Sequence, residues 1–97
     1  MTNEKTENIS FEWDEKKRQL NIEKHKIDFE DAILALEQPR FEIRSSRNGE
    51  VRTLAICPIT DRLIAVVYTM RGEKYRIISA RTARKNEQQL YYDRYPR

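Results

Sequence analysis

One histidine, its neighbouring lysine, a tyrosine and several arginines are the residues of this chain best suited to chemistry. His25 follows Lys24, and an imidazole with an ordinary pKa of about 6.5 can move a proton at neutral pH. A guanidinium can donate two hydrogen bonds to a phosphate, and several guanidiniums can stabilise the negative charge of a phosphoryl transition state. The stretch YTMRGEKYRIISARTARKNE, which begins at Tyr68, contains four arginines: Arg71, Arg76, Arg81 and Arg84. These residue types indicate chemistry on a phosphate group.

Each of these residues also has a structural interpretation. His25 lies where a helix is expected to end, and positive charge there suits the helix dipole. Arginines can protect an unpaired sheet edge, and Arg84 fits the solvated face of a C-terminal helix. Tyr68 fits a core position with its hydroxyl at the rim. Arg76 lies among strand-forming residues, so a purely structural role explains it less well.

Length and composition indicate a small globular protein. The 97 residues fit one domain, and we expect residues 1–8 to be a flexible N-terminus and residues 9–97 to be a single domain. The longest apolar run, residues 63–68, is far shorter than the roughly 20 residues that span a bilayer. The N-terminus has no apolar signal core. The sequence therefore predicts a cytoplasmic protein with no membrane association.

The cysteine and histidine content argues against a disulfide or a metal site. Cys57 is the only cysteine and His25 the only histidine, so neither an internal disulfide nor a cluster with metal-ligand spacing is expected. Cys57 precedes Pro58 and has no base near it in sequence, which makes a catalytic thiol improbable. We expect no metal and no cofactor.

Basic charge is concentrated at the C-terminal end. The net charge is +3, but residues 71–97 hold eight Lys/Arg against three Asp/Glu, whereas residues 1–40 hold seven against ten. An anionic partner, either nucleic acid or an acidic protein surface, would meet the C-terminal end.

Hydrophobic periodicity predicts an α+β fold. It consists of a small antiparallel sheet, formed by a meander plus an N-terminal strand, with two N-terminal helices and one C-terminal helix. The expected elements are a strand over 9–13, a helix from the N-cap Asp14 to about His25, a helix from the N-cap Asp28 towards Pro39, strands on both sides of residues 48–49, a turn over 58–62, strands over 63–70 and 74–80, and a helix capped by Thr82 and reaching about Arg94.

An Asn-Gly pair at positions 48 and 49 predicts a β-hairpin. A type I′ turn needs positive φ at both central residues, which these residue types tolerate. A two-residue loop sets Ile43 opposite Leu54 and Phe41 opposite Ile56. This apolar matching supports the register.

Two consecutive isoleucines, Ile77 and Ile78, indicate that the last strand is covered on both faces and is central in the sheet. Its arginines are therefore not edge protection. A three-residue turn over 71–73 places Arg76 opposite Tyr68, whereas a two-residue turn places Arg76 opposite Thr69. We expect Arg76 to emerge beside Tyr68.

These side chains are sufficient for RNA cleavage without a metal. The 2′-hydroxyl of RNA is a nucleophile already placed beside its phosphate, so an enzyme needs only to orient it, take its proton and neutralise charge.

Two sequence blocks resemble the BrnT toxin family. FEWDEKKRQLNIEKHKIDFEDA is similar to a family pattern of Trp-Asp, spaced Lys and Asn, Lys-His, and an aromatic before an acidic residue and Ala. VVYTMRGEKYRIISARTARKNE is similar to a pattern of V-V-Y-T, Arg, and R-I-I-S-A-R before a basic helix with Glu. The matched positions are Trp13, Lys24, His25, Tyr68, Arg71, Arg76 and Arg81.

The resemblance implies a ribonuclease toxin of a bacterial type II toxin-antitoxin module with a RelE-like fold. It also implies a BrnA-like ribbon-helix-helix antitoxin as partner, a heterotetramer, and contact with operator DNA only through the antitoxin. RNA would be the substrate. The matched residues suggest His25 or Tyr68 for proton transfer, Lys24 and Arg76 on the scissile phosphate, and, as RNA-binding residues, Arg71 and Arg81. Trp13 is interpreted as a packing residue.

Two departures from the family pattern leave an alternative open. Lys26 stands where the family usually has glycine after Lys-His, which favours a left-handed helix cap. Cys57 and Pro58 replace a glycine and a basic or polar residue. The alternative is a catalytically weak or inactive interaction module that acts as co-repressor with the antitoxin.

Overall fold

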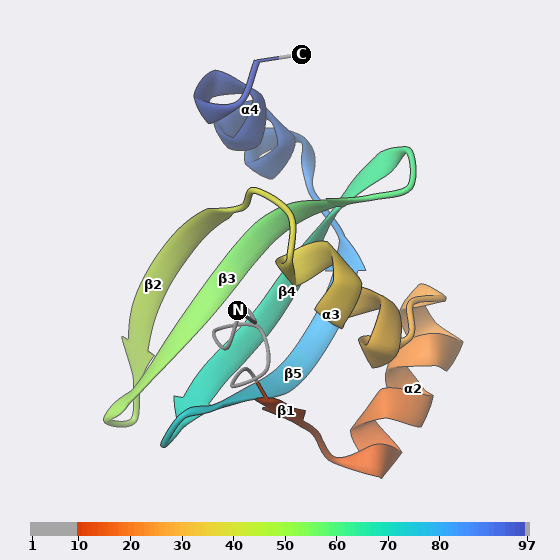
Figure 1. Cartoon of the computed structure of the whole chain (residues 1–97), viewed down its shortest axis with the longest axis vertical. Helices are drawn as coiled ribbons and strands as arrows, with labels where there is room; N and C mark the ends of the chain where they lie inside the picture. Colours follow the sequence, from red (N-terminus) through yellow and green to blue (C-terminus); the bar gives the residue numbers. More distant parts are fainter. Residues whose placement is uncertain (1–9, 97) are drawn as a thin grey trace, which may run out of the picture.

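A five-stranded sheet in the order β1-β5-β4-β3-β2 forms the centre of the computed structural model, which describes residues 10–96 (Figure 1). β1 pairs parallel with β5, and the other strands form an antiparallel meander. The elements are β1 Ser10–Glu12, α2 Glu15–His25, α3 Phe29–Leu36, β2 Phe41–Arg47, β3 Glu50–Ile59, β4 Arg62–Arg71, β5 Lys74–Thr82 and α4 Lys85–Arg94. The α+β prediction and the placement of the N-terminal strand at an edge of the meander are confirmed. The expectations for residues 1–8 and for Ile9 lie outside the described residues.

The β2–β3 hairpin has the predicted turn and register. Asn48 and Gly49 have φ values of 54° and 79°, as a type I′ turn requires. Ile43 pairs with Leu54, and Phe41 pairs with Ile56. The residue types of the turn and the apolar pairs across the strands therefore both favour this hairpin register.

The β3–β4 turn is shorter than predicted because Pro58 remains in the strand. β3 continues to Ile59, and Pro58 pairs with Leu63. The last residue of β3 that pairs with β2 is Ile56. The missing N–H of Pro58 therefore points to a side where β2 has already ended, and no ladder hydrogen bond is lost.

The β4–β5 turn contains two residues, which makes the expected pairing of Tyr68 with Arg76 wrong. Gly72 has a φ of 63° and occupies the first central position of the turn, where a type II′ turn needs glycine. Arg76 therefore pairs with Thr69, and Tyr68 pairs with Ile77. Since neighbouring residues of a strand point to opposite faces, Tyr68 and Arg76 lie on opposite faces of the sheet.

β5 contains a bulge and is longer than predicted. Val67 pairs with Ser79 whereas Tyr68 pairs with Ile77, so Ile78 is an extra residue in β5. β5 runs to Thr82, and Arg84, rather than Thr82, is the N-cap of α4. β5 nevertheless has neighbours on both sides, and the prediction of a central strand is confirmed.

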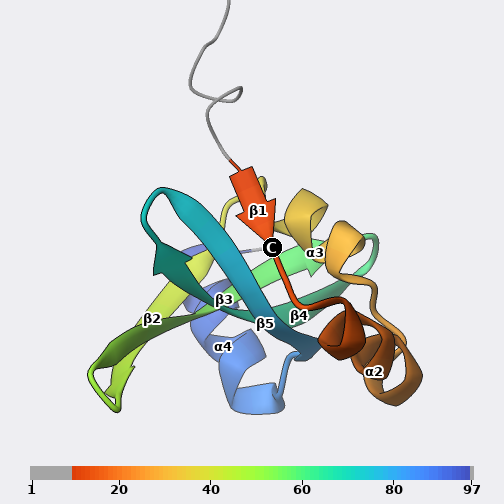
Figure 2. The same cartoon turned by 90° about the horizontal axis from the view of Figure 1, so that it is seen from below.

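The helices cover the two faces of the sheet (Figure 2). α3 packs on one face, here called the α3 face, through Phe29, Ala32, Ala35 and Leu36, which are buried with Ile64 and Val66 and other sheet residues. α4 packs on the opposite face, here called the α4 face, where Tyr91 contacts a cluster that contains Ile56 and Leu63. Complete burial of one such side chain contributes roughly 1.5 to 3 kcal/mol. Within residues 10–96, no helix is long and apolar enough to cross a membrane.

α2 begins as predicted and closes the free edge of β5. The carboxylate of Asp14 accepts hydrogen bonds from the N–H groups of Lys16 and Lys17. Further along, the buried side chain of Asn21 donates to the carbonyl of Ala80 at 2.8 Å and accepts from its N–H at 3.1 Å. Asn21 also donates to the carbonyl of Ile27 at 2.9 Å. The side-chain amide of Asn21 thus satisfies backbone groups of β5 that a neighbouring strand would otherwise bond, at a point that β1 does not reach.

Candidate active site

A groove lies on the part of the α3 face that extends towards the β2–β3 turn. We call it the Tyr68 groove. Its wall contains guanidiniums and two tyrosine rings, which are groups that bind nucleic acids, together with two carboxylates. The lining residues are Arg40, Glu42, Arg44, Gly49, Glu50, Val51, Thr53, Tyr68, Thr69, Met70, Arg71 and Tyr75.

Glu42 is at the centre of the polar contacts in the groove. Its Oε2 accepts hydrogen bonds of 2.7 Å from the Tyr68 hydroxyl and 2.7 Å from Nε of Arg40. A terminal nitrogen of Arg44 lies 3.9 Å from the other carboxylate oxygen. Burial by itself would raise the pKa of Glu42, but the hydrogen bonds from Tyr68 and Arg40 outweigh it and lower the pKa. Glu42 is therefore a carboxylate at neutral pH.

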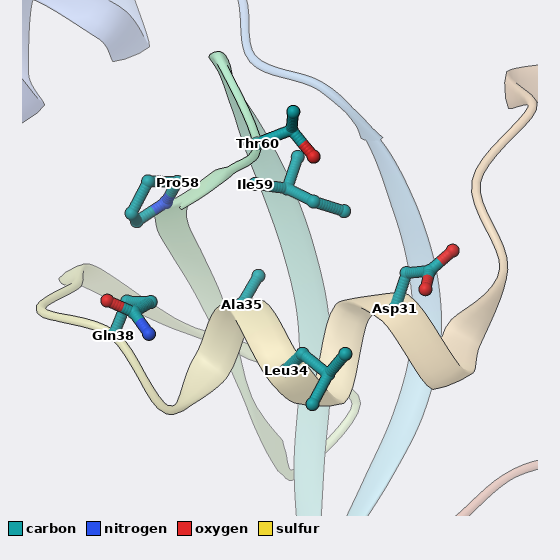
Figure 3. Close-up of a pocket in the computed structure, with 7 residues that line it drawn as sticks. All are labelled: Asp31, Leu34, Ala35, Gln38, Pro58, Ile59 and Thr60. Atoms are coloured by element: carbon teal, nitrogen blue, oxygen red, sulfur yellow. The ribbon is translucent and has the colours of Figure 1, made fainter.

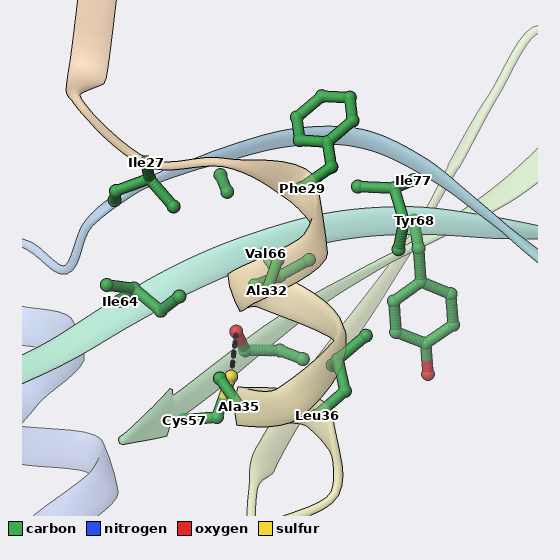
Figure 4. Close-up of a cluster of buried hydrophobic side chains, with 12 residues drawn as sticks. Ile27, Phe29, Ala32, Ala35, Leu36, Cys57, Ile64, Val66, Tyr68 and Ile77 are labelled. Carbon is green, nitrogen blue, oxygen red and sulfur yellow. Dashed lines mark hydrogen bonds between the residues drawn. The ribbon is translucent and has the colours of Figure 1, made fainter. Parts of the chain in front are cut away.

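Tyr68 is held in its protonated form. Burial and the hydrogen bond to Glu42 raise the pKa of Tyr68 to about 12. The side chain closes one end of the core cluster, and its hydroxyl points away from the other labelled side chains (Figure 4). Tyr68 therefore has the core position with its hydroxyl at the rim that the sequence suggested, and this hydroxyl contacts Glu42 in the groove.

Contacts from the opposite side of the sheet position Arg40. The hydroxyl of Tyr91 donates to the carbonyl of Pro39 at 2.9 Å, and the hydroxyl of Tyr95 donates to the carbonyl of Arg40 at 3.2 Å. The guanidinium of Arg40 donates to the carbonyl of Leu36 at the end of α3. Both helices thus fix the segment that leads into β2.

Aromatic rings continue the groove towards β1. The ring centroid of Tyr75 lies 5.0 Å from that of Tyr68 and 5.2 Å from that of Phe11. The guanidinium carbon of Arg40 lies 5.9 Å from the Tyr75 centroid, within the range of a cation–π contact. A base or a phosphate would both find partners here.

The predicted site residues do not all line this groove. Tyr68 and Arg71 do. Lys24 and His25 lie in the last turn of α2, beside β5, and are not among the groove residues. Arg76 lies on the α4 face, as its pairing with Thr69 requires.

Ion pairs hold Arg76 and Arg81. Arg76 donates to Glu12 of β1 at 3.1 Å. Arg81 makes two hydrogen bonds, of 2.9 and 2.8 Å, to the two carboxylate oxygens of Glu87, and Glu87 is 7% exposed in its side chain. The Arg81–Glu87 pair connects α4 to β5. Arg76 and Arg81, which both belong to the second sequence block, therefore each have a structural partner.

The sequence interpretation missed Arg40, Glu42 and Arg44. Their signal was present, since these three charges alternate with apolar or small residues along a strand. The hairpin register places Glu42 opposite Ala55 and Arg44 opposite Thr53. The sequence interpretation used only the apolar residues on one face of this hairpin, so the charged residues on the other face were assigned no role.

A second hollow lies between α3 and the β3–β4 turn (Figure 3). Leu34 is 61% exposed at its rim. The lining residues are Asp31, Leu34, Ala35, Gln38, Pro58, Ile59 and Thr60. Asp31 is the charged group among them, so this hollow lacks the cations that a phosphate site needs.

Cys57 has no features of a nucleophile. Its thiol is buried beneath α3, and burial raises its pKa to about 12. Figure 4 shows its sulfur beside a backbone carbonyl, which is that of Ala55 at 3.7 Å. Among residues 10–96, no cluster of three or more His, Cys, Asp or Glu side chains could hold a metal ion.

Comparisons with known proteins cover the groove and all but the first two residues of the two sequence blocks. A family model described as "Ribonuclease toxin, BrnT, of type II toxin-antitoxin system" matches residues 13–87. The fold is similar to the 1.1 Å crystal structure of the Brucella abortus ribonuclease toxin BrnT, with a TM-score of 0.61 and 32% sequence identity over 79% of this chain and 99% of that chain. No curated protein matches the chain.

Proposed function

This chain belongs to the BrnT family of ribonuclease toxins from type II toxin-antitoxin systems, and on that premise we propose that it cleaves RNA in the Tyr68 groove. The observation that carries the proposal is the carboxylate of Glu42 held between the Tyr68 hydroxyl and Arg40. A fixed carboxylate can act as a general base and the arginines around it can neutralise charge on the phosphate, which are two functions that transesterification of RNA needs.

Glu42 is the proposed general base. It takes the proton of a ribose 2′-hydroxyl, the 2′-oxygen forms a bond to phosphorus, and the bond from phosphorus to the 5′-oxygen breaks. The 5′-oxygen takes a proton from solvent. The products are a 2′,3′-cyclic phosphate and a 5′-hydroxyl end. Tyr68 and Arg40 orient the carboxylate and keep it ionised.

Arginines supply the positive charge for the phosphate. Arg44, with a side chain 73% exposed, is free to turn towards a bound phosphate. Arg71 also lines the groove, where it lies 3.4 Å from Glu50. Guanidiniums can stabilise the developing charge without a metal ion, so metal-independent cleavage is part of the proposal. Tyr75 offers a ring on which a base can stack.

Lys24, His25, Arg76 and Arg81 receive secondary roles in this proposal. Lys24 and His25 bind a flanking part of the RNA rather than the scissile phosphate. Arg76 and Arg81 act mainly through their ion pairs with Glu12 and Glu87.

Cleavage of a defined RNA by purified variants tests these assignments. We expect Glu42→Gln to lower kcat by about 10² to 10⁴-fold, as removal of a general base does, and Arg44→Ala to weaken cleavage clearly. Arg47→Ala, on the same strand but outside the groove lining, is the matched control and should cleave normally. Activity should persist in EDTA and leave a 2′,3′-cyclic phosphate.

His25→Ala separates the two possible sites. Loss of cleavage in His25→Ala together with full activity of Glu42→Gln would place the chemistry at the end of α2. A wild-type chain that binds antitoxin but never cleaves RNA would support the non-catalytic co-repressor instead.

The proposed partner is a BrnA-like ribbon-helix-helix antitoxin in a cytoplasmic heterotetramer. The family description includes a toxin-antitoxin system, and operator DNA would be contacted only through the antitoxin. Co-purification of the neighbouring gene product with this chain, and loss of toxicity on co-expression, are the expected results. Unrelieved toxicity in the presence of that product would refute this partner.

A further inference from the structure

The outer edge of β2 is unpaired among the described elements. β2 ends the strand order, and both views show no labelled element beyond it (Figures 1 and 2). The other edge of the sheet differs, because β1 covers the start of β5 and Asn21 bonds the backbone of Ala80. An open strand edge presents a template for pairing with another strand.

The hairpin register defines which backbone groups are open. A two-residue turn makes Arg47 and Glu50 a hydrogen-bonded pair, and such pairs alternate with non-hydrogen-bonded ones in an antiparallel ladder. The N–H and C=O groups of Glu42, Arg44 and Ser46 therefore point away from β3. They are available to a neighbouring strand.

The side chains along this edge are complementary to themselves. Ile43 is 40% exposed on the α4 face, while Glu42 and Arg44, on the α3 face, carry opposite charges. In an antiparallel pair centred on Ile43, Glu42 lies opposite Arg44 of a second copy, and Arg44 lies opposite Glu42. The two isoleucines meet at the centre, and the outward backbone groups of Glu42 and Arg44 form the hydrogen-bonded pairs.

Charge selects this register over its neighbour. Centring the pair on Arg44 would place two arginines directly opposite each other, and like charges in that position are unfavourable. In the register centred on Ile43, both charge pairs are attractive.

We propose that a second copy of this chain pairs with the edge of β2, antiparallel and centred on Ile43, and joins two five-stranded sheets. Arg44 of the second copy then lies beside Glu42 and adds a cation to the Tyr68 groove. The pairing itself does not depend on RNA cleavage, whereas its effect on catalysis rests on the proposed function. Few residues pair, so the dimer should depend on protein concentration.

Disulfide trapping tests the register. In an Ile43→Cys variant the two thiols meet at the centre, within the Cα separation that a disulfide needs. In the matched control, Ser45→Cys, the two cysteines are roughly 14 Å apart along the paired strands. The native Cys57 is buried, so it should not compete in either variant. We expect Ile43→Cys to form covalent dimers at least tenfold faster than Ser45→Cys, and equal rates would overturn the proposal.

Charge exchange tests the same pairing without cross-linking. In sedimentation experiments we expect Arg44→Glu to weaken the wild-type dimer by tenfold or more, because two pairs become repulsive. Restoration of the dimer by Glu42→Arg combined with Arg44→Glu would support the proposal. Should the double variant unfold, as circular dichroism would reveal, Ile43→Lys replaces it and should also give monomers. The proposal would be overturned by a wild-type chain that stays monomeric at millimolar concentration. It would also be overturned by a dimer whose stability does not change with Arg44→Glu and Ile43→Lys. Neither measurement requires the chain to cleave RNA.

Discussion

The hydroxyl of Tyr68 donates a hydrogen bond of 2.7 Å to the carboxylate of Glu42, and this contact joins β4 to β2 across the intervening strand β3. On β3, Ala55 lies opposite Glu42 and Thr53 lies opposite Tyr68, and both of these side chains are small. The contact makes one residue of the core a partner of the proposed general base. Its removal should therefore change the chemistry more than the fold.

Tyr68→Phe should shift the pH dependence of RNA cleavage. The pKa of Glu42 lies below its ordinary value, partly because of the hydrogen bond from Tyr68. Loss of this donor raises the pKa of Glu42, so a higher pH is needed to ionise the base. We expect the acid limb of the kcat/KM profile to move to higher pH, with a smaller change in the folded structure. A lower rate with an unmoved acid limb would show that Tyr68 acts by packing alone.

Asn21→Ala should destabilise the protein by about 2 to 4 kcal/mol. The substitution leaves the N–H and C=O of Ala80 and the carbonyl of Ile27 without their partner in a buried place, and each unsatisfied buried group costs about 1 to 3 kcal/mol. Urea unfolding measures the change. Gln19→Ala, on the exposed side of the same helix, is the control and should stay within about 0.5 kcal/mol of wild type. An equal effect of both substitutions would contradict the edge-closing role of Asn21.

Glu87→Gln should lower stability at neutral pH and flatten its dependence on acid. The hydrogen bonds from Arg81 are the main cause that lowers the pKa of Glu87 below its ordinary value of 4.5. Because the folded pKa is depressed, the stabilisation is fully present above pH 4.5 and is lost as the pH falls through the folded pKa. We expect a loss of about 1 to 3 kcal/mol at pH 7.

Unfolding measured from pH 7 down to pH 3 tests this linkage. The difference between wild type and Glu87→Gln should shrink as the pH falls. Asp93→Asn, on the exposed side of the same helix, is the matched control. A difference that stays constant over the whole range would exclude ionisation of Glu87 as its source.

Lys26→Gly should stabilise the protein by about 1 kcal/mol. Lys26 ends α2 in the left-handed conformation, with φ 60° and ψ 32°, and its N–H donates to the carbonyl of Ile22. A side chain in this conformation costs roughly 1 to 2 kcal/mol, which glycine avoids while losing more chain entropy on folding. With Lys26 in place of the glycine of the family pattern, the helix cap therefore keeps its left-handed geometry but its backbone is strained. Thermal unfolding provides the measurement, and a lower melting temperature for Lys26→Gly would contradict this account.

Much of the fold was accessible from local sequence signals. The caps Asp14 and Asp28 were correctly predicted, as was the hairpin register around the Asn-Gly turn. The two isoleucines correctly marked β5 as central. Such signals are local, because a cap, a turn or an alternation involves residues within a few positions of each other.

The candidate site was less accessible for two reasons. The length of the β4–β5 turn decides the face on which Arg76 lies, and the sequence allowed two lengths. The groove also joins residues far apart in the chain, such as Glu42 and Tyr68, whose contact crosses β3 at the small side chains of Thr53 and Ala55.

The sequence alone thus established the family resemblance, the order of helices and strands and the hairpin pairing, since these follow from residue types at short range. The tertiary structure decided which charged groups meet. Arg76 forms an ion pair with Glu12, and Arg81 forms one with Glu87. Glu42 accepts hydrogen bonds from Tyr68 and Arg40. The physical reason is that a one-residue change in a turn, or one bulge at Ile78, reverses the face of every residue that follows in the strand.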